Sequence, residues 1–240
     1  MSNRVFLFSV GVFMFFFNCE EPAKTTFSEI SISTENNNIV EINIPKANGN
    51  STIINAINYS IEKAVITALQ IGNADHIEIE TIQESITSFN DEFENFKSDF
   101  PESLQVWNAQ IDGEILFQSP EIISISITSY VNTGGAHGIL NISFLNFDST
   151  TGKQIMNKEL FTNIETFKEI AEIHFNEAIK EKDMRFEADK FKLPENISYT
   201  EDGLVLLYNT YEIAPYSTGI IEFSIPFDEI ESYLIFNGAR

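Results

Sequence analysis

The sequence predicts an α+β fold in which amphipathic helices pack on antiparallel sheets. Before residue 101, two segments repeat apolar residues at three- and four-residue steps, whereas from Leu104 onward the period changes to two. A third helical segment near residue 170 is again followed by short strands. Helices kept apart from runs of consecutive strands are typical of α+β folds. We therefore expect two abutting α+β units that divide near residue 119.

The first unit, residues 39–119, is expected to begin with an edge strand over Ile39–Ile44 that Pro45 ends. Ser51 is expected to cap a long helix, with Gly72 just past its end. A second helix follows from about Ile82 to Phe96, and Pro101 stops it. The apolar stripes of both helices indicate core packing rather than a ligand surface. In the first helix the stripe consists of Ile54, Ile57, Ile61, Val65, Ala68 and Leu69.

The strands that follow are expected to form an antiparallel meander with one buried face. Residues 106–117 favour a hairpin that turns at Asp112-Gly113. The clearest strand is Ile123–Val131, with isoleucines on one face and hydroxyl residues on the other. A strand over Leu140–Phe147 and a turn at Thr151-Gly152 follow.

The second unit, residues 120–240, continues with a helix from about Glu165 to Glu181. Three strands come next, and a short helix from Phe227 to Leu234 closes the chain. The expected strands are Ile197–Tyr199, Gly203–Tyr208 and Ile220–Ile225.

The first 18 residues predict a signal peptide. Arg4 precedes Val5–Phe17, an apolar run with six phenylalanines that is too short for a comfortable membrane span. The only cysteine of the chain, Cys19, follows this run after one residue, Asn18, at the position where a bacterial lipoprotein carries its lipid. Phe16-Phe17-Asn18 departs from the usual lipobox, so an uncleaved anchor or an ordinary buried cysteine is the alternative. We expect lipid attachment at Cys19, a tether over residues 19–38, and a membrane-anchored location in the cell envelope.

The charge is strongly acidic: 14 Lys and Arg stand against 36 Asp and Glu, a net charge of −22. This balance argues against nucleic-acid binding and leaves attraction for a cationic partner open. A single cysteine excludes an intramolecular disulfide and a cysteine-rich metal site, and we expect no cofactor or metal.

Two segments break the strand and helix patterns. Thr133–Gly138 has three glycines, Gly134, Gly135 and Gly138, which allow close backbone approach to a ligand, and it carries His137. The alternative is an ordinary glycine-rich turn. Residues 208–219 combine Tyr208, Tyr211 and Tyr216 with Pro215, and such rings suit protein and sugar recognition. Packing of an ordinary loop onto a sheet is the alternative here.

Two motifs resemble the extracytoplasmic domain of the RsiV and PdaC families. The first is Tyr130 followed by Thr133-Gly134-Gly135-Ala136-His137-Gly138, and the second is the tyrosine-rich segment over residues 208–219. The resemblance covers nearly the whole chain after the signal peptide and implies a PdaC-like unit followed by an RsiV-like unit of unknown function. RsiV is an anti-sigma factor that binds lysozyme, and in PdaC the domain precedes a peptidoglycan deacetylase domain. The anti-sigma segment and the deacetylase domain have no counterpart among these residues. The resemblance implies the fold, an envelope location and a cell-wall or lysozyme-related binding role.

Catalytic motifs are scarce. No Gly-x-Ser-x-Gly elbow or His-Glu-x-x-His helix occurs, and His76, His137 and His174 are the only histidines. His174 and Glu177 lie one helical turn apart and form a weak candidate for two metal ligands. We expect a non-catalytic module that binds a cationic protein such as lysozyme, or peptidoglycan fragments. The alternatives are a cell-wall-modifying hydrolase that uses His137 and a purely structural lipoprotein. The predicted binding residues are Tyr130, Gly134, Gly135, His137, Tyr208, Tyr211, Pro215 and Tyr216.

Overall fold

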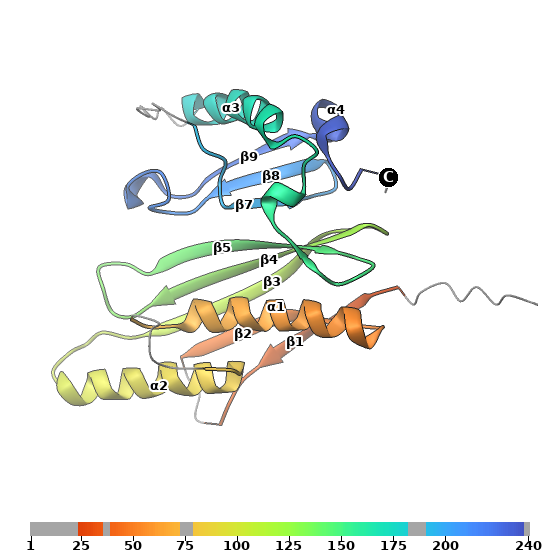
Figure 1. Cartoon of the computed structure of the whole chain (residues 1–240). Coiled ribbons are helices and arrows are strands. Elements are labelled where there is room, and N and C mark those ends of the chain that lie inside the picture. The colour runs from red at the N-terminus through yellow and green to blue at the C-terminus, as the bar shows by residue number, and fades with distance from the viewer. Residues whose placement is uncertain (1–23, 36–38, 73–78, 182–190, 238–240) are drawn as a thin grey trace, which may run out of the picture.

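The computed structural model describes residues 24–35, 39–72, 79–181 and 191–237 and confirms the α+β fold (Figure 1). The signal peptide and Cys19 lie outside the described residues. Two sheets are stacked, and the helices cover their outer faces. Within the described residues, no helix has the length and apolar character that crossing a membrane requires.

The larger sheet has six strands in the order β1-β2-β3-β4-β5-β6. All neighbours pair antiparallel except β2 and β3, which run parallel because two helices connect them. The strands are β1 Thr26–Ile32, β2 Val40–Asn48, β3 Asn108–Gln118, β4 Ile122–Asn132, β5 Ile139–Asp148 and β6 Gln154–Ile155.

The crossover helices are α1 Ser51–Leu69 and α2 Ile82–Asp99. The cap of α1 is Asn50 rather than Ser51, because the Asn50 side chain accepts a hydrogen bond from the Thr52 amide at 3.0 Å. Thr81 and Glu84 form a capping box at the start of α2. As the apolar periodicity predicted, one face of each helix is buried, and Trp107 packs against Phe89 of α2.

Four expectations about the larger sheet were wrong. Part of the predicted tether is strand β1, which pairs along β2, so β2 is an inner strand and not an edge. Pro45 lies within β2 but beyond the stretch paired with β3, where its missing N–H interrupts no bond between these two strands. Asp112-Gly113 is the middle of β3 and not a turn. A Cβ on Gly113 would lie 2.5 Å from Pro45 Cδ, so the glycine permits close approach of β2 instead.

The smaller sheet consists of β7 Asn196–Tyr199, β8 Gly203–Tyr208 and β9 Ile221–Pro226, all antiparallel. Helix α3, Ile164–Glu181, and the short helix α4, Phe227–Ile230, cover its outer face (Figure 1). A second hydrophobic core fills this space, with the α3 residues Phe167, Ala171 and Phe175 among its members.

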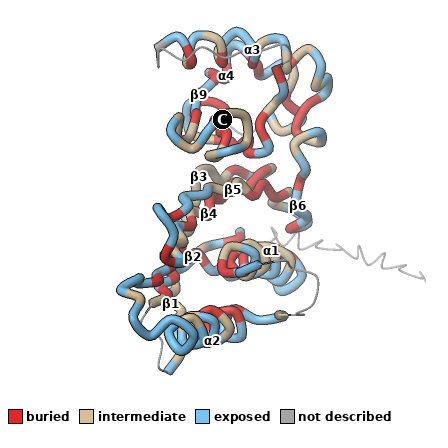
Figure 2. The backbone as a smooth tube through the Cα atoms, turned by 90° about the vertical axis from the view of Figure 1, so that its left-hand side faces the viewer, coloured by how far each residue is buried: buried red, intermediate tan, exposed pale blue. Residues whose placement is uncertain are grey.

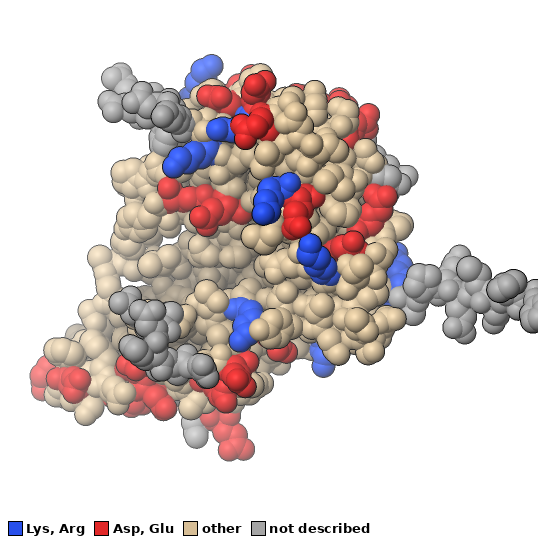
Figure 3. Space-filling view, viewed as in Figure 1, with Lys and Arg blue, Asp and Glu red and all other residues tan. Residues whose placement is uncertain are grey.

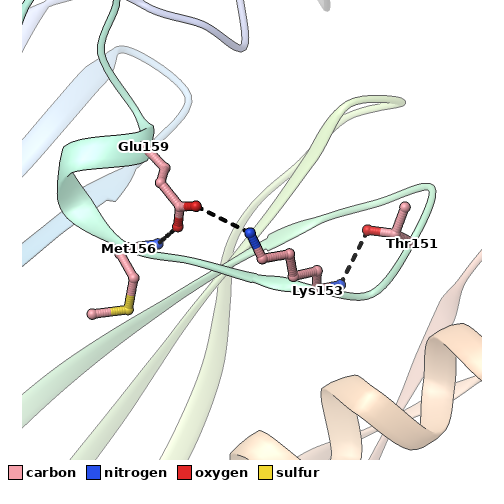
Figure 4. A network of polar contacts seen from close by, with 4 residues as sticks. All are labelled: Thr151, Lys153, Met156 and Glu159. Carbon is pink, nitrogen blue, oxygen red and sulfur yellow. Dashed lines mark hydrogen bonds and ion pairs between the residues drawn. The ribbon is translucent and has the colours of Figure 1, made fainter.

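The division near residue 119 also differs from the structure, because β3 and β4, on either side of it, pair along nearly their full length. The first unit therefore extends to β6. The segment that leaves β6 toward α3 is held by Lys153, whose Nζ lies 3.0 Å from a Glu159 carboxylate oxygen (Figure 4). The other oxygen of Glu159 accepts a hydrogen bond from the Met156 amide at 2.9 Å.

The two sheets face each other, so the larger sheet has two buried faces and not the one that was expected (Figure 2). Ser124, on the hydroxyl face of β4, is fully buried and donates to Asn146 Oδ1 at 2.6 Å. Asn146 in turn donates to the carbonyl of Ile197 at 2.8 Å. Asn196 accepts from the Phe144 amide at 3.0 Å. The face predicted for solvent is therefore a polar joint between the two units.

Candidate functional site

The glycine loop, residues 133–138, joins β4 to β5, and two of its glycines sit where a side chain would not fit. Gly134 has φ +84° and is buried, and a Cβ there would lie 2.5 Å from Gln105 Oε1. A Cβ on Gly138 would lie 2.4 Å from the ring of Tyr130. The glycines therefore let Gln105 and Tyr130 pack directly on the loop backbone.

The tyrosine segment, residues 208–219, connects β8 to β9 and is fastened to the larger sheet by Asn209. The Asn209 side chain accepts from the Ile142 amide at 2.8 Å and donates to the Ile142 carbonyl at 2.8 Å. This amide thus pairs with a backbone peptide of β5 as a strand neighbour would. Asn209 was not among the predicted binding residues, and an asparagine directly after a strand was the only signal for it.

Tyr208 is a core residue and does not face the site. It is 1% exposed, lies against Phe175, and donates its hydroxyl to the Lys192 carbonyl at 2.5 Å. Burial, followed by the charge of Glu212, raises the pKa of this phenol well above its ordinary value. Tyr208 was predicted as a binding residue, but its ring is enclosed by the smaller sheet and α3.

The tyrosine segment and the glycine loop meet through Tyr216 and His137. Their rings are nearly parallel, with centroids 3.6 Å apart and an interplanar angle of 11°. The Tyr216 hydroxyl also donates to the Gly138 carbonyl at 3.1 Å. The two sequence segments singled out above are therefore brought together, each from a different unit. Pro215, which was predicted as a binding residue, is exposed and precedes the short 3-10 turn that holds Tyr216.

Tyr211 extends this row of rings into solvent. Its ring centroid lies 5.7 Å from that of Tyr216, and the residue is 60% exposed. Its φ is +70°. Among the described residues, Tyr211 is the only residue other than glycine with a positive φ. A left-handed backbone is costly for an aromatic residue. Hydrogen bonds on either side maintain it: Glu212 accepts from the Asn209 amide at 2.8 Å and from the Glu195 amide at 3.0 Å.

A pocket of about 520 Å³ opens between these rings and the C-terminal end of α1. His137 and Tyr211 form one wall, Gln70 and Ile71 stand at the end of α1, and Asn141 lines it from β5. Thr133, Gly135 and Ala136 complete the loop side of the pocket. Gly134 and Tyr130 do not line it and support the loop from outside. Figure 3 shows the surface hollowed between the two units, with acidic side chains mainly above and below the hollow.

The described lining of the pocket carries no Lys, Arg, Asp or Glu side chain and is rich in hydrogen-bonding groups. His137 is exposed, its Nδ1 lies 3.3 Å from the Gly138 carbonyl, and no bond joins it to a carboxylate in the described part of the chain. The arrangement suits binding through ring faces, amides and hydroxyls.

The other candidate cluster, His174 with Glu177, is not brought together as a metal site. His174 Nε2 lies instead 3.0 Å from a carboxylate oxygen of Glu229, which joins α3 to α4. Within the described residues, no group of three or more His, Cys, Asp or Glu could hold a metal ion.

Comparisons with known proteins match both units. Residues 32–140 match the family described as deacetylase PdaC, and residues 148–228 match a family described as protein of unknown function, DUF3298. A PdaC-like N-terminal unit followed by a C-terminal unit of unknown function is thereby confirmed. The PdaC match runs past residue 119 to the end of the glycine loop, in line with the continuous sheet.

Two solved structures have similar folds. One is a DUF3298 family protein from Pseudomonas aeruginosa, 19% identical, with a TM-score of 0.58 and coverage of 90% of this chain and 96% of that one. The other is a DUF3298 family member from Bacteroides fragilis, 18% identical, with a TM-score of 0.61 and coverage of 90% and 94%. At these identities the likeness establishes the fold alone. No functionally curated protein matches the chain.

Proposed function

We propose that this chain, a PdaC-like unit followed by a DUF3298 unit, is an extracytoplasmic envelope module that binds cell-wall glycan without cleaving it. The observation that carries the proposal is the pocket of about 520 Å³ walled by His137 and Tyr211, with Tyr216 stacked behind His137. Apolar ring faces together with uncharged donors and acceptors are the groups that recognise sugar rings. The family matches favour an envelope location.

The test is a calorimetric titration of the full-length chain with soluble peptidoglycan fragments. Tyr211→Ala and His137→Ala should each weaken binding about tenfold, which corresponds to about 1.4 kcal/mol. Phe100→Ala is the matched control, because Phe100 is 59% exposed, close to the 60% of Tyr211, and does not line the pocket. Absence of binding, or equal effects of all three variants, would contradict the proposal.

The same fragments test the hydrolase alternative. Products should not appear with the wild type, because His137 lacks a carboxylate partner in the described part of the chain. Turnover that His137→Ala abolishes would support a hydrolase instead. If Tyr211 and Tyr216 variants change stability but bind as the wild type does, the purely structural role holds.

The charge favours a second candidate, a cationic protein such as lysozyme. The chain carries 36 Asp and Glu against 14 Lys and Arg, and such a field speeds encounter with a basic partner. Titration with lysozyme at low and high salt, with cytochrome c as a basic control, tests it. Binding of lysozyme alone that weakens with salt would support this candidate, and equal binding of both proteins would indicate charge without specificity.

Membrane attachment belongs to the same proposal. Cys19 lies outside the described residues, and its position one residue beyond the apolar run 5–17 supports lipid attachment there. Palmitate labelling of the wild type and of Cys19→Ser tests it. A wild type that takes up no label would remove the lipid anchor from the proposal.

A further inference from the structure

A second hollow adjoins the pocket and continues it along α1. It has a volume of about 280 Å³ and lies between α1 and the strands β4 and β5. Both hollows are lined by Ala68, Ser129 and Asn141, so they form one groove. From Ser60 at one end to Gln70 at the other, the groove follows about 15 Å of helix. A groove of this length accepts an extended ligand rather than a single compact one.

The extension differs from the pocket in charge. Its polar lining consists of Ser60, Thr67, Ser143 and Gln154 besides the shared residues, and it includes Lys63. Of the described residues that line the whole groove, Lys63 is the only Lys, Arg, Asp or Glu. Hydroxyls and amides thus continue from the pocket into a segment with one positive charge.

Lys63 forms no ion pair with a carboxylate in the described part of the chain, although the protein has 36 acidic residues. The residue is half-buried, and its ammonium lies 5.5 Å from the centre of the Tyr59 ring. This contact holds the side chain without neutralising it. The ammonium therefore keeps its capacity to donate charged hydrogen bonds to an anionic ligand group.

We infer that the Lys63 end of the groove is a subsite for the carboxylate of an acidic sugar, in a glycan whose neutral ring lies against Tyr211 and His137. The inference rests on the proposed glycan binding and adds a requirement for one negative charge at a fixed distance from the ring site. A net charge of −22 repels anions at long range, so an acidic glycan needs a local cation such as Lys63 to be retained.

Two forms of one probe isolate the charge. Soluble peptidoglycan glycan fragments whose stem peptides have been removed, so that the muramic acid carboxylates are free, are titrated into the full-length chain before and after these carboxylates are amidated with a carbodiimide and an amine. The wild type should bind the untreated fragments about tenfold more tightly, as expected for a hydrogen bond to a charged group. Lys63→Gln should remove this preference, so that both forms of the fragments bind with equal affinity, while Lys63→Arg should keep it.

Lys97 provides the control, because its ammonium lies 5.3 Å from the centre of the Phe93 ring on α2 and it does not line the groove. Lys97→Gln should therefore bind both probes as the wild type does. Equal wild-type affinity for the two probes, or a preference that survives Lys63→Gln, overturns the subsite and leaves the proposed glycan binding in place. Failure of the wild type to bind either probe overturns both.

Discussion

The ring of His137 lies face to face with that of Tyr216, at a centroid separation of 3.6 Å, although the two residues belong to different units. His137 comes from the loop between β4 and β5 of the larger sheet, and Tyr216 from the segment between β8 and β9 of the smaller one. The pocket wall therefore exists only when the two units are docked. The glycan binding that we propose for this wall therefore requires the polar joint between the sheets to stay intact.

Tyr216→Phe tests the hydrogen bond that accompanies this stack. The variant keeps both rings but loses the donor to the Gly138 carbonyl, so the free energy of unfolding should fall by about 1 kcal/mol. Urea denaturation measures the change. Tyr59→Phe is the control, since Tyr59 is 61% exposed and its hydroxyl makes no hydrogen bond in the described part of the chain. Equal stability of Tyr216→Phe and wild type would contradict the prediction.

The helices could be predicted from the sequence because their apolar stripes repeat at the helical period. Ile57, Ile61 and Val65 are buried at the positions that the pattern assigned. The turn predicted at Asp112-Gly113 was wrong, because a glycine after an aspartate is a turn signal, whereas here Gly113 makes room for Pro45 of β2. That contact joins residues distant in sequence and has no local pattern.

The candidate site could be predicted in part. The glycine loop and the tyrosine segment were recognised by composition, and they do meet. Tyr208 was wrongly predicted as a binding residue. It lies at the end of β8, and both faces of this strand are buried, which the sequence pattern of the strand did not indicate. The fastening of Asn209 to Ile142 could not be predicted, because it depends on how two separate sheets dock.

Gly138→Ala should disturb the support that Tyr130 gives to the glycine loop. The added methyl would lie 2.4 Å from the outer end of the Tyr130 ring, so this partly exposed side chain must shift and the free energy of unfolding should fall by about 1 kcal/mol, the low end for overpacking. In a Tyr130→Ala background the same substitution should cost less than about 0.5 kcal/mol, since the obstructing ring is gone. A thermal or urea double-mutant cycle measures the coupling. Additive effects would show that Tyr130 does not require the glycine.

Tyr211 offers a test of backbone strain at the pocket. At φ +70° glycine is unstrained and alanine is not, so Tyr211→Gly should be more stable than Tyr211→Ala by about 1 kcal/mol. This order is the reverse of that in an ordinary helix or strand. Both variants lack the exposed ring and should bind glycan equally weakly. If the alanine variant were the more stable of the two, the left-handed conformation would not persist at this position.

Asp148 should contribute acid-sensitive stability at the end of β5. Partial burial alone would raise its pKa, but hydrogen bonds from the Thr150 hydroxyl and amide and from the Thr151 amide lower the pKa overall. A carboxyl with a lowered pKa in the folded state binds protons more readily when unfolded. Its contribution is therefore complete above an unfolded pKa of about 3.9 and is lost as the pH falls through the lower folded value.

Asp148→Asn should consequently be less stable than wild type near pH 6, and the difference should shrink as the pH falls below about 4. Urea unfolding at a series of pH values from neutral to acid measures both curves. Asp202→Asn is the control, because Asp202 is an exposed acid whose side chain makes no hydrogen bond in the described part of the chain. A stability difference for Asp148→Asn that is constant across this range would mean that the asparagine loses packing or geometry rather than charge. The turn at Thr150 and Thr151 would then be held without help from the ionised carboxylate.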